Sequence, residues 1–103
     1  MAEHLNLGDL LSDLTKLLEP FDRRVTAVTT LLAEQKSASV INARAEFIRV
    51  TWIKCVDINT QMCRLVTADE RLQLTYFTAK KFGKMESKIF QSLDDIAERL
   101  ATL

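Results

Sequence analysis

The sequence predicts an all-α fold in which residues 1–103 form one domain, a bundle of four to five amphipathic helices. The chain has only two glycines and one proline among its 103 residues. A sheet of many short strands needs more turn residues than that. Apolar residues also recur every three or four positions along most of the chain, which is the spacing of a helix face. The same spacing allows an elongated bundle with a coiled-coil-like seam.

The first predicted helix begins near Leu7 and ends before Pro20. Leucines at helical spacing give it one apolar face: Leu7, Leu10, Leu11, Leu14, Leu17 and Leu18. Asn6 can cap its start, and Asp9 suits the positive end of the helix dipole. Because proline lacks a backbone N–H, we expect Pro20 to end this helix and to open the next one.

The second predicted helix covers residues 21–36. Its apolar positions alternate steps of four and three residues: Phe21, Val25, Val28 and Leu32, with the polar Gln35 at the end. This is a short heptad seam, typical of helices that pack side by side. A connection follows at residues 36–39, and Ser39 is the expected cap of the next helix.

The stretch from residue 40 to 66 is ambiguous, because it is rich in β-branched residues that favour strands. Its periodicity favours a helix instead, since the positions of one mainly apolar seam repeat in alternating steps of four and three residues. These positions are Ile41, Ala45, Ile48, Trp52, Cys55, Asn59, Met62 and Val66. We expect a helix in which Trp52 is largely buried, and a two-stranded insertion remains the alternative.

Val50 and Ile53 lie off this seam, so the predicted helix is apolar on more than one side. Such a helix is typical of a central position, surrounded by several neighbours. Without interruption from residue 39 to 66 it would be roughly 42 Å long. We therefore expect a break near residues 57–60 unless the molecule is elongated.

A further helix is predicted from residue 68 to 82. Thr67 and Glu70 match a capping box at its start. Gly83 fits the left-handed position just past its end. The lysine pair at positions 80 and 81 would then lie in its last turn, where positive charge complements the helix dipole.

The last predicted helix runs from residue 85 to 101. It has a heptad-like seam formed by Met85, Ile89, Leu93, Ile96, Leu100 and Leu103. Seams of this kind either form the core of the chain or bind a partner. The candidate residues for either role are Leu7, Leu11, Leu14, Leu18, Ile48, Trp52, Ile89, Leu93, Ile96 and Leu100.

The charges of the chain are unevenly distributed, although their formal sum is zero. Residues 1–38 carry four Lys or Arg and six Asp or Glu, a balance of −2. Residues 39–84 carry eight and four, a balance of +4, and residues 85–103 carry two and four, a balance of −2. The acidic ends can pair with the basic middle inside the fold, or the basic middle can serve an acidic partner.

The sequence offers little catalytic or metal-binding chemistry. His4 is the only histidine, and it stands near the start of the chain, where side chains usually lie on the surface. Cys55 and Cys63 occur in apolar stretches without an obvious base, so we expect reduced core thiols. A structural zinc site needs four Cys or His ligands, and the chain has three such residues. We expect no catalytic residue, no metal, no cofactor and no enzyme activity.

The sequence also bears on location. Reduced cysteines suit a reducing compartment. The first residues, Met1 to His4, lack the basic region of a signal peptide. The longest uncharged run extends from Val25 to Ala33, far short of the ~20 residues that a membrane-spanning helix needs. We expect a cytoplasmic protein, with a nuclear location as the alternative.

The function predicted from these features is a non-enzymatic protein–protein interaction module that self-associates, such as a small subunit, adaptor or chaperone of a larger assembly. The apolar seams, and the apolar residues left off them, are the basis of this prediction. The alternative is a nucleic-acid-associated helical protein that uses the basic middle, residues 39–84. Lysines around an aromatic ring can touch phosphate, and the candidates for contact with an anionic partner are Lys80, Lys81 and Lys84.

Overall fold

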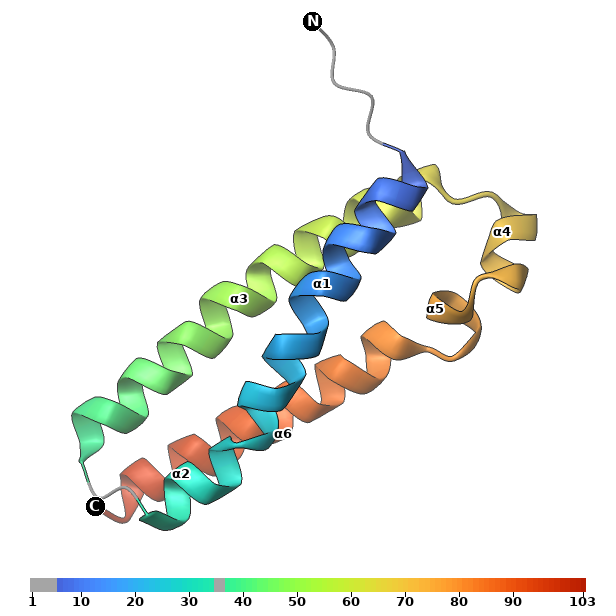
Figure 1. Cartoon of the computed structure of the whole chain (residues 1–103). Coiled ribbons are helices and arrows are strands. Elements are labelled where there is room, and N and C mark those ends of the chain that lie inside the picture. Colours follow the sequence, from blue (N-terminus) through green and yellow to red (C-terminus); the bar gives the residue numbers. More distant parts are fainter. Residues whose placement is uncertain (1–5, 35–36) are drawn as a thin grey trace, which may run out of the picture.

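The computed structural model describes residues 6–34 and 37–103, and every regular element in these ranges is a helix. Three long helices, α1 (Leu7–Thr26), α3 (Ala38–Leu65) and α6 (Lys81–Ala101), are joined by the short helices α2 (Val28–Glu34), α4 (Ala68–Gln73) and α5 (Thr75–Thr78). α3 runs antiparallel to both α1 and α6 (Figure 1). The molecule measures 49 × 32 × 18 Å, so the predicted all-α bundle is confirmed and is elongated.

The core lies between the three long helices. Each helix turns one apolar face inward, and the fully buried side chains include Leu14, Phe21, Ile41, Ile48, Ile89 and Ile96. Trp52 is 8% exposed, as predicted, and its ring stacks on that of Phe82 at 4.8 Å between centroids. This stack ties the first turn of α6 to the middle of α3.

Pro20 does not end the first helix, contrary to our expectation. α1 continues through Pro20 to Thr26, and the chain breaks only at Ala27, whose N–H bonds back to Arg23 and Val25. Pro20 is exposed, whereas Phe21 and Val25 each retain 2% exposure on the inner face of α1. The burial of these two side chains therefore outweighs the one backbone hydrogen bond that proline cannot make.

The stretch from 40 to 65 belongs to a single helix, with Val66 as its extended C-cap, which confirms the prediction from periodicity and excludes the strand pair. The break expected near residues 57–60 is absent, and the length of α3 is accommodated by the elongated shape. Thr60 lies inside the helix, and its hydroxyl donates to the carbonyl of Val56 at 2.9 Å. The helix begins at Ala38 with Ser37 at the N-cap position, so the expected cap at Ser39 lies two residues too late.

The region from 68 to 82 is divided rather than forming one helix. Its predicted capping box is present, with Glu70 N–H donating to the Thr67 hydroxyl at 3.1 Å. Lys80, not Gly83, adopts the left-handed conformation, with φ 52° and ψ 42°. Gly83 instead lies in the first turn of α6, which the stacking of Phe82 on Trp52 holds against α3. Lys80 and Lys81 therefore stand at the start of a helix, not at its end.

Polar contacts hold the short elements in place. Asn6 caps α1, as predicted, by accepting a hydrogen bond from Asp9 N–H at 2.8 Å. The Arg99 guanidinium donates to the carbonyl of Leu32 at 3.3 Å and so connects the end of α6 to α2.

No helix among residues 6–34 and 37–103 combines the length and the hydropathy of a membrane-spanning segment.

Candidate interaction surfaces

An open groove of about 680 Å³ lies between α1 and the start of α6. These two helices both pack on α3 and diverge towards the corner formed by α4 and α5 (Figure 1). The residues that line the groove are Leu11, Thr15, Leu18, Glu19, Asp22, Leu74, Thr75, Tyr76, Lys81, Lys84, Met85 and Lys88. We call this site the α1–α6 groove.

The floor of the α1–α6 groove is apolar. Met85 and Tyr76 are almost completely buried beneath it, and Leu11, Leu18 and Leu74 are half-buried along its sides. The Tyr76 hydroxyl donates to the Asn59 side chain at 2.6 Å, which anchors α5 to α3. Burial raises the pKa of the Tyr76 phenol, so this hydroxyl keeps its proton and remains a donor.

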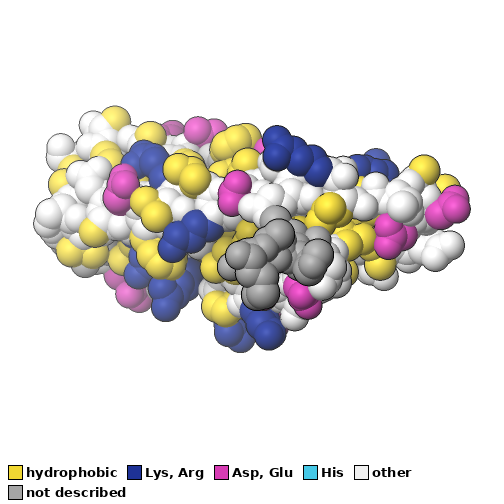
Figure 2. All heavy atoms as spheres, turned by 90° about the horizontal axis from the view of Figure 1, so that it is seen from above, with side chains coloured by type: hydrophobic (Ala, Val, Ile, Leu, Met, Phe, Trp, Pro, Cys, Tyr) yellow, Lys and Arg dark blue, Asp and Glu magenta, His cyan; other side chains and the backbone are white. Residues whose placement is uncertain are grey.

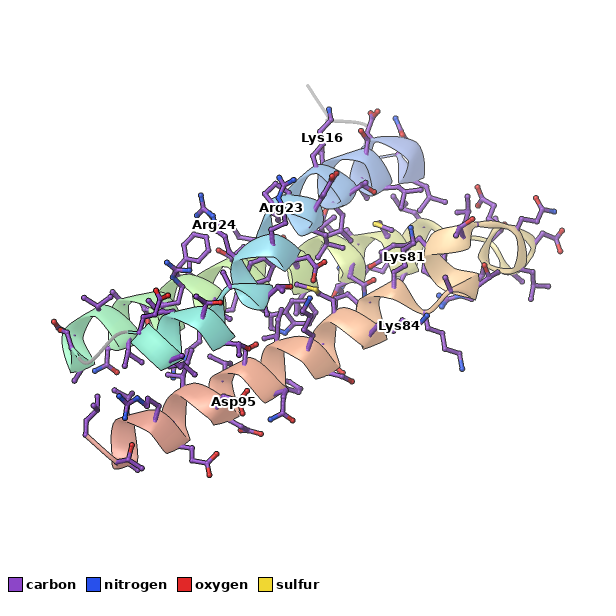
Figure 3. The ribbon with its side chains drawn as sticks, turned by 60° about the horizontal axis from the view of Figure 1, so that its bottom comes forward. Lys16, Arg23, Arg24, Lys81, Lys84 and Asp95 are labelled. Atoms are coloured by element: carbon purple, nitrogen blue, oxygen red, sulfur yellow. The ribbon has the colours of Figure 1, made fainter. Side chains whose placement is uncertain are left out.

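Lysines form one rim of the groove. Lys88 crosses to α1, where its ammonium donates to the Asp22 carboxylate at 2.5 Å and to the Thr26 hydroxyl at 2.5 Å. Lys81 and Lys84 have no ion-pair partner among residues 6–34 and 37–103. Figure 3 shows both at the start of α6. The two lysines are three residues apart and are therefore neighbours on the helix surface. Because neither is paired, the α6 side of the groove has two uncompensated positive charges.

The start of α6 strengthens this positive field. The first turn of α6 contains no acidic residue, and Lys80 at its N-cap provides no side-chain hydrogen bond. The N-terminal end of a helix carries a partial positive charge that acidic groups normally offset. Here Lys81 and Lys84 add to it instead. Of the three lysines predicted to contact an anionic partner, these two line the groove, whereas Lys80 does not.

The facing wall of the groove belongs to α1 and carries acidic groups. Asp22 is engaged by Lys88, as described above. Glu19, three residues earlier on α1, has no ion-pair partner within the described part of the chain. The groove therefore has unpaired charges of opposite sign on its two walls, above an apolar floor.

A second apolar surface lies on the outer side of α3. Val50, Ile53 and Val56 lie there and are 44, 66 and 38% exposed, and Phe47, 36% exposed, continues the row around the helix towards α1, because each step of three residues turns back by about 60°. We call these four residues the α3 ridge. The prediction that Val50 and Ile53 face neighbouring helices is therefore wrong. α3 packs only its inner face against α1 and α6, which leaves its second apolar side open.

One end of the α3 ridge is braced by α1. The Phe47 ring meets that of Phe21 edge-on, with 6.3 Å between centroids. The Arg24 guanidinium lies 4.9 Å above the same Phe47 ring. These contacts orient Phe47, whereas Val50, Ile53 and Val56 face outward along the helix.

The predicted seam residues are divided between core and surface. Leu14, Ile48, Trp52, Ile89 and Ile96 are buried in the core of the chain itself. Five are only partly buried and pack against that core: Leu7, Leu11, Leu18, Leu93 and Leu100. Of these, Leu11 and Leu18 also line the groove. The seams therefore serve mainly to hold the bundle together.

The basic middle of the chain does not converge on one surface. The Arg49 guanidinium forms a long ion pair with the Glu46 carboxylate, at 3.8 Å, on the exposed surface of α3. The Arg71 guanidinium of α4 lies 4.9 Å from the centroid of the Phe77 ring. Arg44 is half-buried, and Arg64 is exposed near the end of α3. On the face drawn in Figure 2, basic side chains alternate with hydrophobic and acidic ones.

The two cysteines differ in environment. Cys55 is buried, as expected, whereas Cys63 is exposed, so the expectation of two core thiols is wrong for Cys63. Position 63 follows the buried Met62 directly, and adjacent helical residues point about 100° apart. No group of three His, Cys, Asp or Glu residues able to hold a metal occurs in the described ranges, and His4 lies outside them.

We expect iodoacetamide to modify Cys63 rapidly near neutral pH and Cys55 only after unfolding. Burial raises the pKa of the Cys55 thiol from 9.0 to about 11. The unfolded chain therefore releases this proton at a lower pH than the folded chain. The free energy of unfolding consequently falls as the pH rises from 9.0 to about 11. Cys55→Ala should lose this part of the decline and Cys63→Ala should keep it. Equal modification rates of both thiols in the native protein would contradict the assignment.

Comparison of the chain with protein-family models, with curated proteins and with solved structures gave no match.

Proposed function

We propose that this chain is a non-enzymatic protein–protein interaction module, a small subunit, adaptor or chaperone of a larger assembly. Its α1–α6 groove receives an amphipathic helix from a partner protein. The observation that carries this proposal is the open apolar floor of the groove between two long helices, where a further helix of a bundle would pack. The exposed free thiol of Cys63 supports a reducing compartment, the cytoplasm or the nucleus.

The dimensions of the groove suit a short helix. Its lining on α1 extends from Leu11 to Asp22, which corresponds to roughly 16 Å along the helix axis. About three turns of a partner helix fit this length. Such a helix binds through apolar anchors at positions i, i+3 or i+4, and i+7, and the apolar lining that includes Leu18, Leu74 and Met85 suits anchors of that kind.

The unpaired charges on the two walls define the flanks of the partner helix. The flank next to α6 is acidic, because Lys81 and Lys84 lack partners among the described residues. The flank next to α1 is neutral or basic, because Glu19 lies on that wall. Charge complementarity of this kind selects the orientation of the partner more than it adds affinity.

Site-specific photo-crosslinking in extracts of the native host tests this function. A p-benzoylphenylalanine side chain at Thr15, which is exposed on the groove wall, should crosslink a partner peptide. The same probe at Ser87, on the outer side of α6, serves as the matched control. Mass spectrometry should identify the Thr15-linked peptide as an amphipathic helix with acidic side chains on one flank. The double variant Lys81→Glu, Lys84→Glu should reduce the yield several-fold.

A nucleic-acid function would give a different result. Fluorescence anisotropy with duplex DNA and single-stranded RNA at ~50 and ~200 mM salt measures the phosphate contribution, because each phosphate contact adds ~0.9 to the salt slope on duplex DNA. We expect no binding at either salt concentration. Tight binding that collapses at high salt, and that disappears when Lys80, Lys81 and Lys84 are changed to Ala, would replace the present proposal with a nucleic-acid partner.

A further inference from the structure

We infer that the outer face of α3 binds the same face of a second copy of this chain, with the two helices antiparallel about a two-fold axis at Ile53. This inference rests on the proposed role as an interaction module, but it uses a different surface. None of the α3 ridge residues lines the α1–α6 groove. A homodimer can therefore present two grooves to partners at once.

The apolar residues of this face are centred on Ile53. Ile53 is the most exposed member of the α3 ridge. At about 100° per residue, Val50 and Val56 lie about 60° to either side of it. In an antiparallel pair with Ile53 on the axis, Val50 of one copy stands at the same height as Val56 of the other. Ile53 then meets its counterpart at the axis, and Val50 and Val56 flank this contact on either side.

The charges on this face complement themselves in the same register. Arg49 and Asp57 lie four residues before and after Ile53, about 40° to either side. Each Arg49 therefore stands level with Asp57 of the second copy, and symmetry produces this pair twice. Glu46 stands level with the neutral Thr60. No like charges face each other at these positions.

A parallel arrangement lacks this complementarity. In a parallel, in-register pair, Arg49 would face Arg49 and Asp57 would face Asp57, and like charges at close range are unfavourable. The antiparallel register also uses most of the helix. Since Ile53 lies near the middle of α3, residues 41–65 of each copy overlap, a length of roughly 37 Å.

The first test is the oligomeric state of the full chain by sedimentation equilibrium. The wild-type protein should be a dimer at micromolar concentration, and Ile53→Asp should shift it to the monomer. The matched control is Leu72→Asp on α4, because Leu72 is 76% exposed but lies off the α3 ridge. Leu72→Asp should leave the dimer unchanged. Circular dichroism should show both variants folded, since both side chains are exposed.

The second test is a charge exchange across the axis. Arg49→Asp replaces two attractive pairs with two repulsive ones, and Asp57→Arg does the same. Each should raise the dimer dissociation constant by about tenfold, the scale expected for exposed pairs that are doubled by symmetry. The double variant Arg49→Asp, Asp57→Arg restores opposite charges at both pairs and should regain most of the affinity. Additive weakening in the double variant would contradict this register.

The third test fixes the axis. Ile53→Cys, made together with Cys63→Ser, should form an intermolecular disulfide under mild oxidation. Helices that pack 8–10 Å apart bring the Cα atoms of a residue on the axis to roughly 4–5 Å, within reach of a disulfide. Leu72→Cys in the same Cys63→Ser protein is the control and should not crosslink.

Two results would overturn the inference. One is a wild-type protein that stays monomeric up to high micromolar concentration. The other is a dimer that persists in Ile53→Asp, because its interface would then lie elsewhere. Neither result affects crosslinking from Thr15 in the groove. Conversely, a confirmed α3 dimer without groove crosslinks would leave this inference intact and remove the proposed partner helix.

Discussion

Replacing Trp52 with Ala should lower the free energy of unfolding by about 3–5 kcal/mol, the range measured for large aromatic side chains removed from a core. Trp52 is 8% exposed and stacks on Phe82 at an interplanar angle of 23°. Its removal leaves a cavity between α3 and the first turn of α6. Urea denaturation followed by circular dichroism measures the loss directly, since the variant has no tryptophan to report by fluorescence.

Two controls make the Trp52 experiment specific. Trp52→Phe keeps an aromatic ring against Phe82 and should lose clearly less stability than Trp52→Ala. Leu72→Ala removes an exposed side chain and should stay within about 0.5 kcal/mol of the wild type. The native emission of Trp52, the only tryptophan, should be blue-shifted and poorly quenched by iodide. A loss below about 1 kcal/mol in Trp52→Ala would show that this contact does not support the core.

Pro20→Ala should raise the free energy of unfolding by about 2 kcal/mol. Proline inside a helix is ~3 kcal/mol less favourable than alanine. Part of this gain is offset, by ~1 kcal/mol, because proline restricts the unfolded chain and alanine does not. Pro20 is exposed, so its replacement removes little packing, and the new N–H can bond to the carbonyl of Lys16. Thermal and urea denaturation both measure the change.

Ser12→Ala, at another exposed position of α1, is the control for helix propensity alone and should gain only a few tenths of a kcal/mol. An unchanged or reduced stability in Pro20→Ala would have a definite meaning. It would show that the backbone at Pro20 is needed to direct Phe21 and Val25 into the core.

Helical periodicity predicted most of this fold, because burial of one face is what holds each long helix in place. The spacing around Trp52 outweighed the β-branched composition of α3, as the continuous helix shows. The errors arose where a tertiary contact overrode a local signal. Phe21 and Val25 keep α1 helical beyond Pro20, and the ring stack of Phe82 holds the turn that contains Gly83 against α3, while the left-handed residue is Lys80.

The candidate surfaces were only partly predictable. Lys81 and Lys84 were expected to contact an anionic partner, and both lie on the rim of the groove. The groove itself depends on the divergence of α1 from α6, which no local pattern encodes. Val50 and Ile53 were recognised as a second apolar side of α3. Composition does not distinguish a side that the chain covers itself from one that stays open.

The corner formed by α4 and α5 has a consequence for how the groove opens. α4 contributes no buried side chain, and its neighbour in the bundle is the four-residue α5. A segment with so few buried contacts unfolds locally at a small fraction of the global free energy, and its amide hydrogens exchange with solvent first. Leu74, between α4 and the anchored α5, lines the groove at this corner. The edge of the groove at Leu74 is thus the part that can yield to a partner helix while the three long helices stay folded.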